Sequence, residues 1–188
     1  MDAKEKNVEA KAGFDQGSKL ASQCLYEPTG KLKVVGVGDI QMSNRLEETI
    51  ITYSLGSCIG LTLYDPVQKV GGMLHAMLPT VKMSRGQHID KPGIFVDTGV
   101  DRMLRGLERM GACKERLIAR IAGCSRTFPE DGIFEIGDKN YAVLKQRLWD
   151  LNIFIRGEDV GGVNWRTLSL RMETGETFLK TSVGWRVL

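Results

Sequence analysis

One short stretch of the chain, residues 50–79, contains both a candidate nucleophile and a candidate base. Cys58 ends the turn Gly56-Ser57-Cys58, which separates two segments rich in apolar and β-branched residues. His75 lies in the apolar segment that follows them. A cysteine thiol beside an imidazole is the minimum equipment for nucleophilic attack on a carbonyl carbon. Backbone N–H groups exposed at such a turn could in addition bind the oxyanion that the attack creates.

Three predicted strands must position this pair. The alternation of apolar and polar residues predicts strands over 50–54 and 59–64, and a third strand over 70–78 after a short loop. Strands joined by a short loop are usually neighbours in a sheet. We therefore expect Cys58, at the mouth of one strand, to meet His75 on the next.

Each of these residues also has an ordinary structural explanation. A lone cysteine is most often a small buried hydrophobe, which is our interpretation of Cys24, Cys113 and Cys124. A histidine in an apolar strand is more often a core side chain than a base. His88, in the polar stretch 80–91, is a rival base, although a histidine on a polar loop is usually solvated. From residue chemistry alone, both explanations of the candidate site stay open.

Several runs of the sequence have a specific spacing when they are taken together. They are TYSLGSC from Thr52, LYDP from Leu63, GGMLHAMLP from Gly71, KPGIFVDT from Lys91, IGDKN from Ile136 and EDVGG from Glu158. Together they closely resemble the CheD family of chemoreceptor glutamine deamidases, from about Leu32 onward. The resemblance places the family's catalytic cysteine on Cys58, its histidine on His75 and its threonine on Thr52.

The resemblance implies hydrolysis of a protein glutamine amide to glutamate, with release of ammonia and without a metal or organic cofactor. Cys58 would attack the amide carbon to form a thioester, while backbone N–H groups of the turn at Gly56 and Ser57 bind the oxyanion. His75 would lower the pKa of the thiol, protonate the leaving ammonia and then activate water. The Thr52 hydroxyl would orient the imidazole, although a strand also favours threonine for its branched shape.

The same resemblance implies partners. The substrate would be the cytoplasmic helices of methyl-accepting chemoreceptors, and many members of the family bind a CheC-type phosphatase. Two alternatives remain: a non-catalytic regulator of such a phosphatase, or a receptor methylesterase that uses the same nucleophile. The intact set of Thr52, Cys58 and His75 argues against the regulator, because an idle site would be free to drift.

Two parts of the chain depart from the resemblance. At 123–128 the chain reads GCSRTF where the family commonly has a Gly-Gly-Ala-x-Met-Phe-like segment, which puts any substrate contact by this segment in doubt. Residues 1–30 lie outside the resemblance and have mixed charges with little apolar periodicity. They are predicted to form a flexible tail, and residues 31–188 the deamidase domain.

The composition narrows the class of protein. A chain of 188 residues with 42% hydrophobic and 26% charged residues predicts one domain with a sizeable core. Scattered charges with a net charge of +3 do not indicate a nucleic-acid or membrane partner. No apolar stretch suggests a secretory signal or a membrane-inserted segment, so we expect a cytoplasmic protein. The cysteines lack metal-ligand spacing.

The remaining pattern predicts a single α+β domain. Predicted strands cover 32–38, 117–122 and 153–155, a hairpin joins 168–172 to 177–180, and helices cover 96–110 and a segment from Asp138 to Leu151. The polar stretch 39–48 is expected to cross the surface. Helices should cover sheet faces. The resemblance implies layered mixed β-sheets like those of toxin deamidases with a Cys–His centre.

Overall fold

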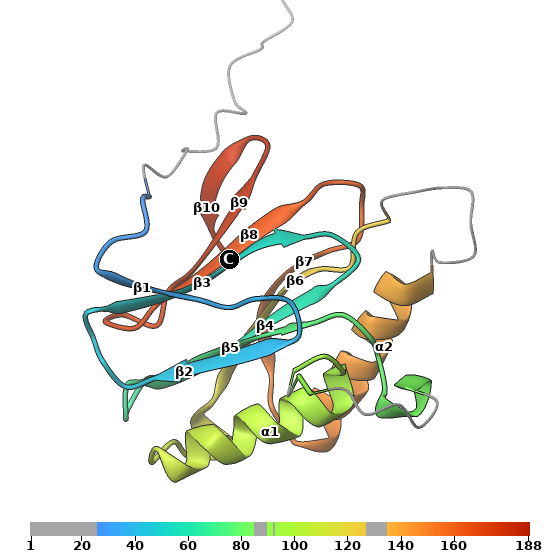
Figure 1. Cartoon of the computed structure of the whole chain (residues 1–188). Coiled ribbons are helices and arrows are strands. Elements are labelled where there is room, and N and C mark those ends of the chain that lie inside the picture. Colours follow the sequence, from blue (N-terminus) through green and yellow to red (C-terminus); the bar gives the residue numbers. More distant parts are fainter. Residues whose placement is uncertain (1–25, 85–89, 92, 127–134) are drawn as a thin grey trace, which may run out of the picture.

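Two five-stranded mixed β-sheets pack face to face and are followed by a layer of helices (Figure 1). The computed structural model describes residues 26–84, 90–91, 93–126 and 135–188. Sheet A has the strand order β1-β3-β8-β9-β10, and sheet B has the order β2-β5-β4-β6-β7. Neighbouring strands are antiparallel except for β1 with β3 and β6 with β7.

The strands are short, as is usual for a layered domain. Those of sheet A are β1 (Lys31–Val34), β3 (Glu48–Leu55), β8 (Arg166–Arg171), β9 (Thr177–Thr181) and β10 (Gly184–Val187). Those of sheet B are β2 (Asp39–Ser43), β4 (Ile59–Asp65), β5 (Val70–Ala76), β6 (Ile118–Gly123) and β7 (Ile155–Val160). The helices are α1 (Val96–Arg109) and α2 (Glu135–Asp150), with the short 3₁₀ turns η1 (Val81–Ser84) and η2 (Lys114–Arg116).

Sheet B is buried on both faces, which explains why every residue of β4 and β5 is buried. Alternate side chains of a strand point to opposite faces. Ile59, Leu61 and Leu63 of β4 pack in the core that sheet B shares with α1 and α2. Between them, Gly60 faces sheet A, because a Cβ at this position would contact Leu55 and other side chains there. Strand β4, which follows Cys58, is therefore held both by the core under the helices and by the core between the two sheets.

Most of the predicted elements are confirmed. The three strands around the candidate site, the first helix, the hairpin of β8 and β9 and the mixed layered sheets are all present. The helices cover sheet B, and the predicted second helix begins slightly earlier, at Glu135. Strand β7 covers residues 155–160, beyond the predicted segment 153–155.

The prediction of a surface connection over 39–48 is wrong. Residues Asp39–Ser43 form the edge strand β2, which pairs antiparallel with β5. Ile40 and Met42 pack against the core under the helices, while the polar residues between them alternate to the other face. The short strand β10 was also not predicted. Both strands carry mostly polar or partly buried residues, because each lies at the edge of its sheet.

Part of the predicted N-terminal tail is described by the structure. Residues 1–25 lie outside the described residues, but Tyr26 is buried and its ring stacks on Phe178 of sheet A. The Tyr26 hydroxyl also shares a hydrogen bond of 2.7 Å with Ser169. Residues 26–30 thus contribute to the outer side of sheet A. No helix in the described ranges is long and apolar enough to cross a membrane.

Candidate active site

A hydrogen bond between the two sheets joins Thr52 to His75. Thr52 lies on β3 of sheet A and His75 on β5 of sheet B, and the Thr52 Oγ1 to His75 Nδ1 distance is 2.7 Å. Both side chains are only 1% exposed. The same hydroxyl donates a hydrogen bond of 2.8 Å to the backbone carbonyl of Val35. The packing of sheet A on sheet B therefore brings together two residues that are 23 positions apart.

This arrangement determines the tautomer of His75. A hydroxyl has one proton, and a backbone carbonyl can only accept, so the proton of Thr52 is donated to Val35. The oxygen of Thr52 must then accept from the ring, which places the imidazole proton on Nδ1. The lone pair of the neutral ring is consequently on Nε2. This atom is buried and has no hydrogen-bond partner among the described residues.

Burial keeps His75 neutral at physiological pH. Removal of the ring from water disfavours its charged form and lowers the pKa of His75 to about 4. Burial also raises the pKa of the Cys58 thiol above its ordinary value. This differs from the prediction that the imidazole would lower the thiol pKa. In the absence of substrate the pair is thus a neutral thiol and a neutral imidazole.

The register of sheet B places Cys58 on the same face as His75. His75 pairs directly with Gly60, and opposite residues of an antiparallel pair project to one face. Cys58 precedes Gly60 by two positions, so it is the diagonal neighbour of His75 on that face. Cys58 is partly buried against the core between the sheets. Within the described residues no hydrogen bond joins the sulfur to Nε2, which is common before a substrate tightens a site.

A second segment supports residues 56–58, which form the candidate nucleophile turn. The carbonyl of Gly56 accepts a hydrogen bond from Ser125 N, and that of Cys58 accepts one from Cys124 N, each of 2.8 Å. Close approach requires a glycine at 123, because a Cβ there would collide with the Cys58 carbonyl. Residues 123–126 belong to the segment that departs from the family pattern, whose last two residues, 127 and 128, lie outside the described residues.

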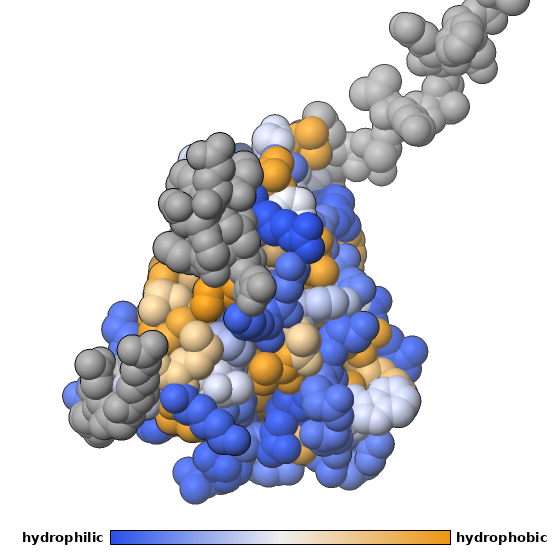
Figure 2. Space-filling model, turned by 90° about the vertical axis from the view of Figure 1, so that its right-hand side faces the viewer, coloured by the Kyte–Doolittle hydropathy of each residue, from blue (hydrophilic) through white to orange (hydrophobic). Residues whose placement is uncertain are grey.

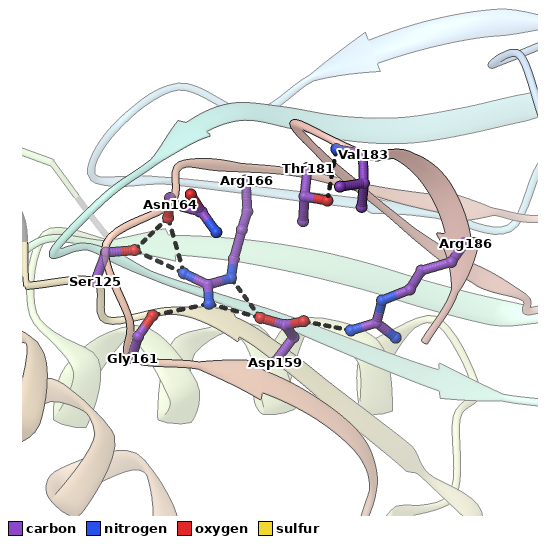
Figure 3. A network of polar contacts seen from close by, with 8 residues as sticks. All are labelled: Ser125, Asp159, Gly161, Asn164, Arg166, Thr181, Val183 and Arg186. Atoms are coloured by element: carbon purple, nitrogen blue, oxygen red, sulfur yellow. Dashed lines mark hydrogen bonds and ion pairs between the residues drawn. The ribbon is translucent and has the colours of Figure 1, made fainter. Parts of the chain in front are cut away.

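A buried arginine in turn holds this supporting segment (Figure 3). Arg166 is 6% exposed and donates to the Ser125 hydroxyl at 2.6 Å and to the carbonyls of Gly161 and Asn164. Its guanidinium also pairs with the Asp159 carboxylate at 2.6 Å. Arg166 was not predicted from the sequence, because nothing local marks an arginine that contacts a residue 41 positions away.

The other cysteines are placed differently from Cys58. Cys124 is buried, and burial raises the pKa of its thiol to about 12. Cys113 was predicted to be buried but is only partly buried, and its thiol donates a hydrogen bond of 2.9 Å to the Glu115 carboxylate. The rival base His88 and Cys24 lie outside the described residues. In the described part of the chain, no group of three or more potential ligand side chains could hold a metal ion.

Apolar residues are interspersed with hydrophilic ones on the side of the molecule where β3 turns into β4 (Figure 2). Tyr53 and Met77, each close in sequence to a candidate site residue, are 47% and 38% exposed. A surface pocket of about 480 Å³ is lined by Tyr53, Ser54, residues 163–167 and residues 180–182. Thr52, Cys58 and His75 do not line this pocket, since they face the space between the sheets.

The chain belongs to the CheD family. The family model described as "CheD chemotactic sensory transduction" matches residues 77–181. A probable chemoreceptor glutamine deamidase CheD of Solibacter usitatus is 41% identical over 149 residues, which cover 78% of this chain and 87% of the relative. The chemoreceptor glutamine deamidase CheD of Thermotoga maritima is 38% identical over 148 residues, 79% of this chain and 90% of the relative.

A comparison with solved structures gives weaker similarity. The hypothetical protein YfiH of Bacillus licheniformis is 18% identical, with a TM-score of 0.39 over 64% of this chain and 49% of that protein.

The family model begins after all three candidate catalytic residues. The match to the family model therefore does not assign roles to Thr52, Cys58 and His75, and the support for those roles is the geometry of the site.

The pKa of His75 predicts a pH dependence of stability. The unfolded chain binds a proton at His75 near pH 6.5, whereas the folded chain binds it only near pH 4, so the stabilisation is complete above pH 6.5 and is lost as the pH falls towards 4. The loss should amount to about 3 kcal/mol in the free energy of unfolding. Urea unfolding of the native chain and of His75→Asn across this range measures it. The two curves should converge at low pH; parallel curves would contradict the burial of a neutral imidazole.

The hydrogen bonds of Arg166 predict that its replacement by methionine destabilises the fold more than the same replacement of Arg186. Arg166→Met removes a buried cation and four of its contacts and should lower the free energy of unfolding by about 3 kcal/mol. Arg186 also pairs with Asp159, but its side chain is 46% exposed. Arg186→Met should therefore cost less than about 1 kcal/mol. Denaturant unfolding of both variants is the measurement, and equal losses would disprove the structural role of Arg166.

Proposed function

We propose that the chain deamidates specific glutamine side chains of methyl-accepting chemoreceptors to glutamate in the cytoplasm. Family membership supports this reaction, since relatives over most of their length are named chemoreceptor glutamine deamidases. The observation that carries the proposal is the Thr52–His75 hydrogen bond. It leaves the Nε2 lone pair free on the sheet face that also carries Cys58, as a base for a thiol nucleophile requires.

The first half of the reaction releases ammonia. The Cys58 sulfur attacks the amide carbon while its proton passes to His75 Nε2, and the carbonyl electron pair moves to oxygen. Backbone N–H groups of Ser57 and Cys58 donate to this oxyanion. The imidazolium then gives its proton to the nitrogen as the carbon–nitrogen bond breaks. Ammonia leaves, and the glutamyl group remains on the sulfur as a thioester.

The second half hydrolyses the thioester. His75 Nε2 takes a proton from water as the water oxygen attacks the thioester carbon. The same backbone N–H groups bind the second oxyanion. When it collapses, the carbon–sulfur bond breaks, the sulfur recovers the proton from the imidazolium, and glutamate is released. Because thiol and imidazole begin neutral and the imidazolium gives up its proton at the end of each half, neither half leaves a charge on the buried pair.

The partners follow from the same proposal. The substrate is a cytoplasmic receptor helix that presents a glutamine, and a CheC-type phosphatase is a candidate regulatory partner. Mass spectrometry of receptor fragments incubated with the chain tests the reaction. Conversion of Gln to Glu raises the mass of a peptide slightly, whereas methyl-ester hydrolysis lowers it by one methylene. Loss of methylene without deamidation would favour a methylesterase, and an unchanged receptor would favour a non-catalytic regulator.

The identity of the nucleophile is tested by cysteine variants. Cys58→Ala should abolish ammonia release from receptor fragments, because no other group of the site can form the thioester. Cys113→Ala and Cys124→Ala should retain turnover, since neither thiol is part of the proposed site. Circular dichroism should show a folded Cys58 variant. Normal turnover by Cys58→Ala would refute the mechanism.

A matched control variant separates the proposed catalytic role of Thr52, the orientation of His75, from its contribution to stability. Thr52→Val keeps the branched shape but no longer fixes the tautomer of His75, so kcat should fall by about 10–100-fold. Thr49→Val removes a hydroxyl that is equally buried on β3 and donates to the Thr29 carbonyl at 2.7 Å. Each variant should lose about 1–3 kcal/mol of unfolding free energy.

The rate of deamidation should fall in Thr52→Val but not in Thr49→Val. Thr52→Ser should recover part of the rate, because it restores a hydroxyl. Steady-state kinetics with one receptor fragment, and unfolding in urea, measure both effects. Equal losses of kcat in the variants at 49 and 52 would assign Thr52 to stability alone.

A further inference from the structure

Asn140 connects the two chain segments that carry the candidate nucleophile and base. It lies on α2 and is fully buried, and its Nδ2 donates to the carbonyls of Ser57 at 3.1 Å and Met77 at 3.0 Å. Ser57 directly precedes Cys58, and Met77 follows His75 by two positions. One amide group thus bonds both segments, although it is 83 and 63 residues distant from them.

The orientation of the Asn140 amide is determined by its surroundings. Both neighbours are carbonyl oxygens, so only the NH₂ group can face them, and Oδ1 must point away. This Oδ1 is buried and has no hydrogen-bond partner in the part of the chain that the structure describes. An unpaired buried oxygen costs stability. Packing alone would favour an apolar residue here, which suggests that the two donated hydrogen bonds have another purpose.

The bond to Ser57 fixes the direction of a backbone donor. The Ser57 carbonyl and the Cys58 N–H belong to one planar trans peptide, in which they point in opposite directions. A carbonyl held towards α2 by Asn140 therefore aims the Cys58 N–H away from that helix. The preceding peptide is fixed in the same way, because Gly56 O accepts from Ser125 N. Among the described residues, no backbone carbonyl accepts a hydrogen bond from the N–H groups of Ser57 and Cys58, and the Cys58 N–H interacts with the sulfur of its own side chain.

We propose that Asn140 is a positioning residue for the oxyanion site of the nucleophile turn. It acts through the Ser57–Cys58 peptide, whose N–H it holds ready for the negative oxygen formed when Cys58 attacks a carbonyl. Donors fixed before the reaction need no reorganisation when the charge develops, which is the source of their effect on rate. The inference rests on the proposed function, since it assigns the oxyanion site of the same nucleophile.

Two reactions of the Cys58 thiol distinguish this role from a general effect on the site. In acylation by p-nitrophenyl acetate, sulfur adds to the ester carbon, oxygen becomes negative, the thiol proton passes to His75, and nitrophenolate leaves with the electrons of its carbon–oxygen bond. In alkylation by iodoacetamide, sulfur displaces iodide at a saturated carbon, the thiol proton again passes to His75, and no oxyanion forms. Only acylation needs the N–H donors, and neither reaction needs a receptor.

The decisive variant is Asn140→Leu, which keeps a similar volume and removes both donated hydrogen bonds. Leu144→Ala is the matched control, because Leu144 is fully buried one turn further along α2 and is not bonded to the turn. This control destabilises the same helix by leaving a cavity. Reactions of Cys58→Ala are subtracted as the background from other nucleophiles. Both rates are measured for each full-length variant, and their ratio is compared with that of the native chain.

For Asn140→Leu the ratio of acylation to alkylation should fall by about 10²-fold, the effect of losing one oxyanion donor. It should stay unchanged for Leu144→Ala. If Asn140→Leu does not fold, Asn140→Ser decides, because its single hydroxyl proton can satisfy only one carbonyl and should give an intermediate ratio. A native ratio in the variants at 140, or an equal fall in both rates, overturns the inference. A native chain that acylates normally but releases no ammonia from receptors refutes the proposed function instead.

Discussion

The Thr52–His75 hydrogen bond is the contact on which the rest of the site depends. It joins the two sheets at a point where both side chains are excluded from water, and it can form only if sheet A and sheet B pack in one register. The Val35 carbonyl, directly after β1, accepts the proton of the Thr52 hydroxyl and adds a third segment to the same constraint. Because strand alternation has a period of two, a slip of one residue in β3 or β5 would move the side chain to the opposite face. Fold and candidate base are therefore specified together.

Burial has opposite effects on the pKa values of Cys58 and His75, the candidate nucleophile and base. It lowers the pKa of the imidazole and raises that of the thiol, so both forms that are stable at neutral pH are uncharged. Such a pair does not attract ions or water strongly, and it exposes no permanent thiolate to oxidation. The proposed reaction would then depend on the alignment of the thiol, Nε2 and the oxyanion donors when a carbonyl group enters. Positioning matters more in this site than the resting charge.

Polar contacts from distant segments supply that positioning. The carbonyls of the nucleophile turn accept hydrogen bonds from residues 124 and 125 and from Asn140 on α2. Arg166 fixes the first of these segments through the Ser125 hydroxyl, and Asp159 compensates its charge. Buried polar networks of this kind stabilise a structure only when their members are paired. Here they also orient the backbone of the turn at residues 56–58.

The sequence by itself determined the local elements. Alternation over 50–54, 59–64 and 70–78, and helical spacing over 96–110, are properties of neighbouring residues, and they placed Cys58 directly before one strand and His75 on the next. The short edge strand β2 was missed because its apolar positions, Ile40 and Met42, are few and only partly buried.

Only the tertiary structure decided how the site is assembled. The tautomer of His75 and the shifted pKa values depend on the packing of one sheet against another, which removes the groups from water. Arg166 and Asn140 contact the turn or its support across 41 and 83 residues. The pattern of residues within a short stretch of sequence does not predict contacts between residues so far apart in the chain. The family resemblance indicated Thr52 before any geometry was known, but the hydroxyl's partners, and hence the free atom of the imidazole, follow from the fold alone.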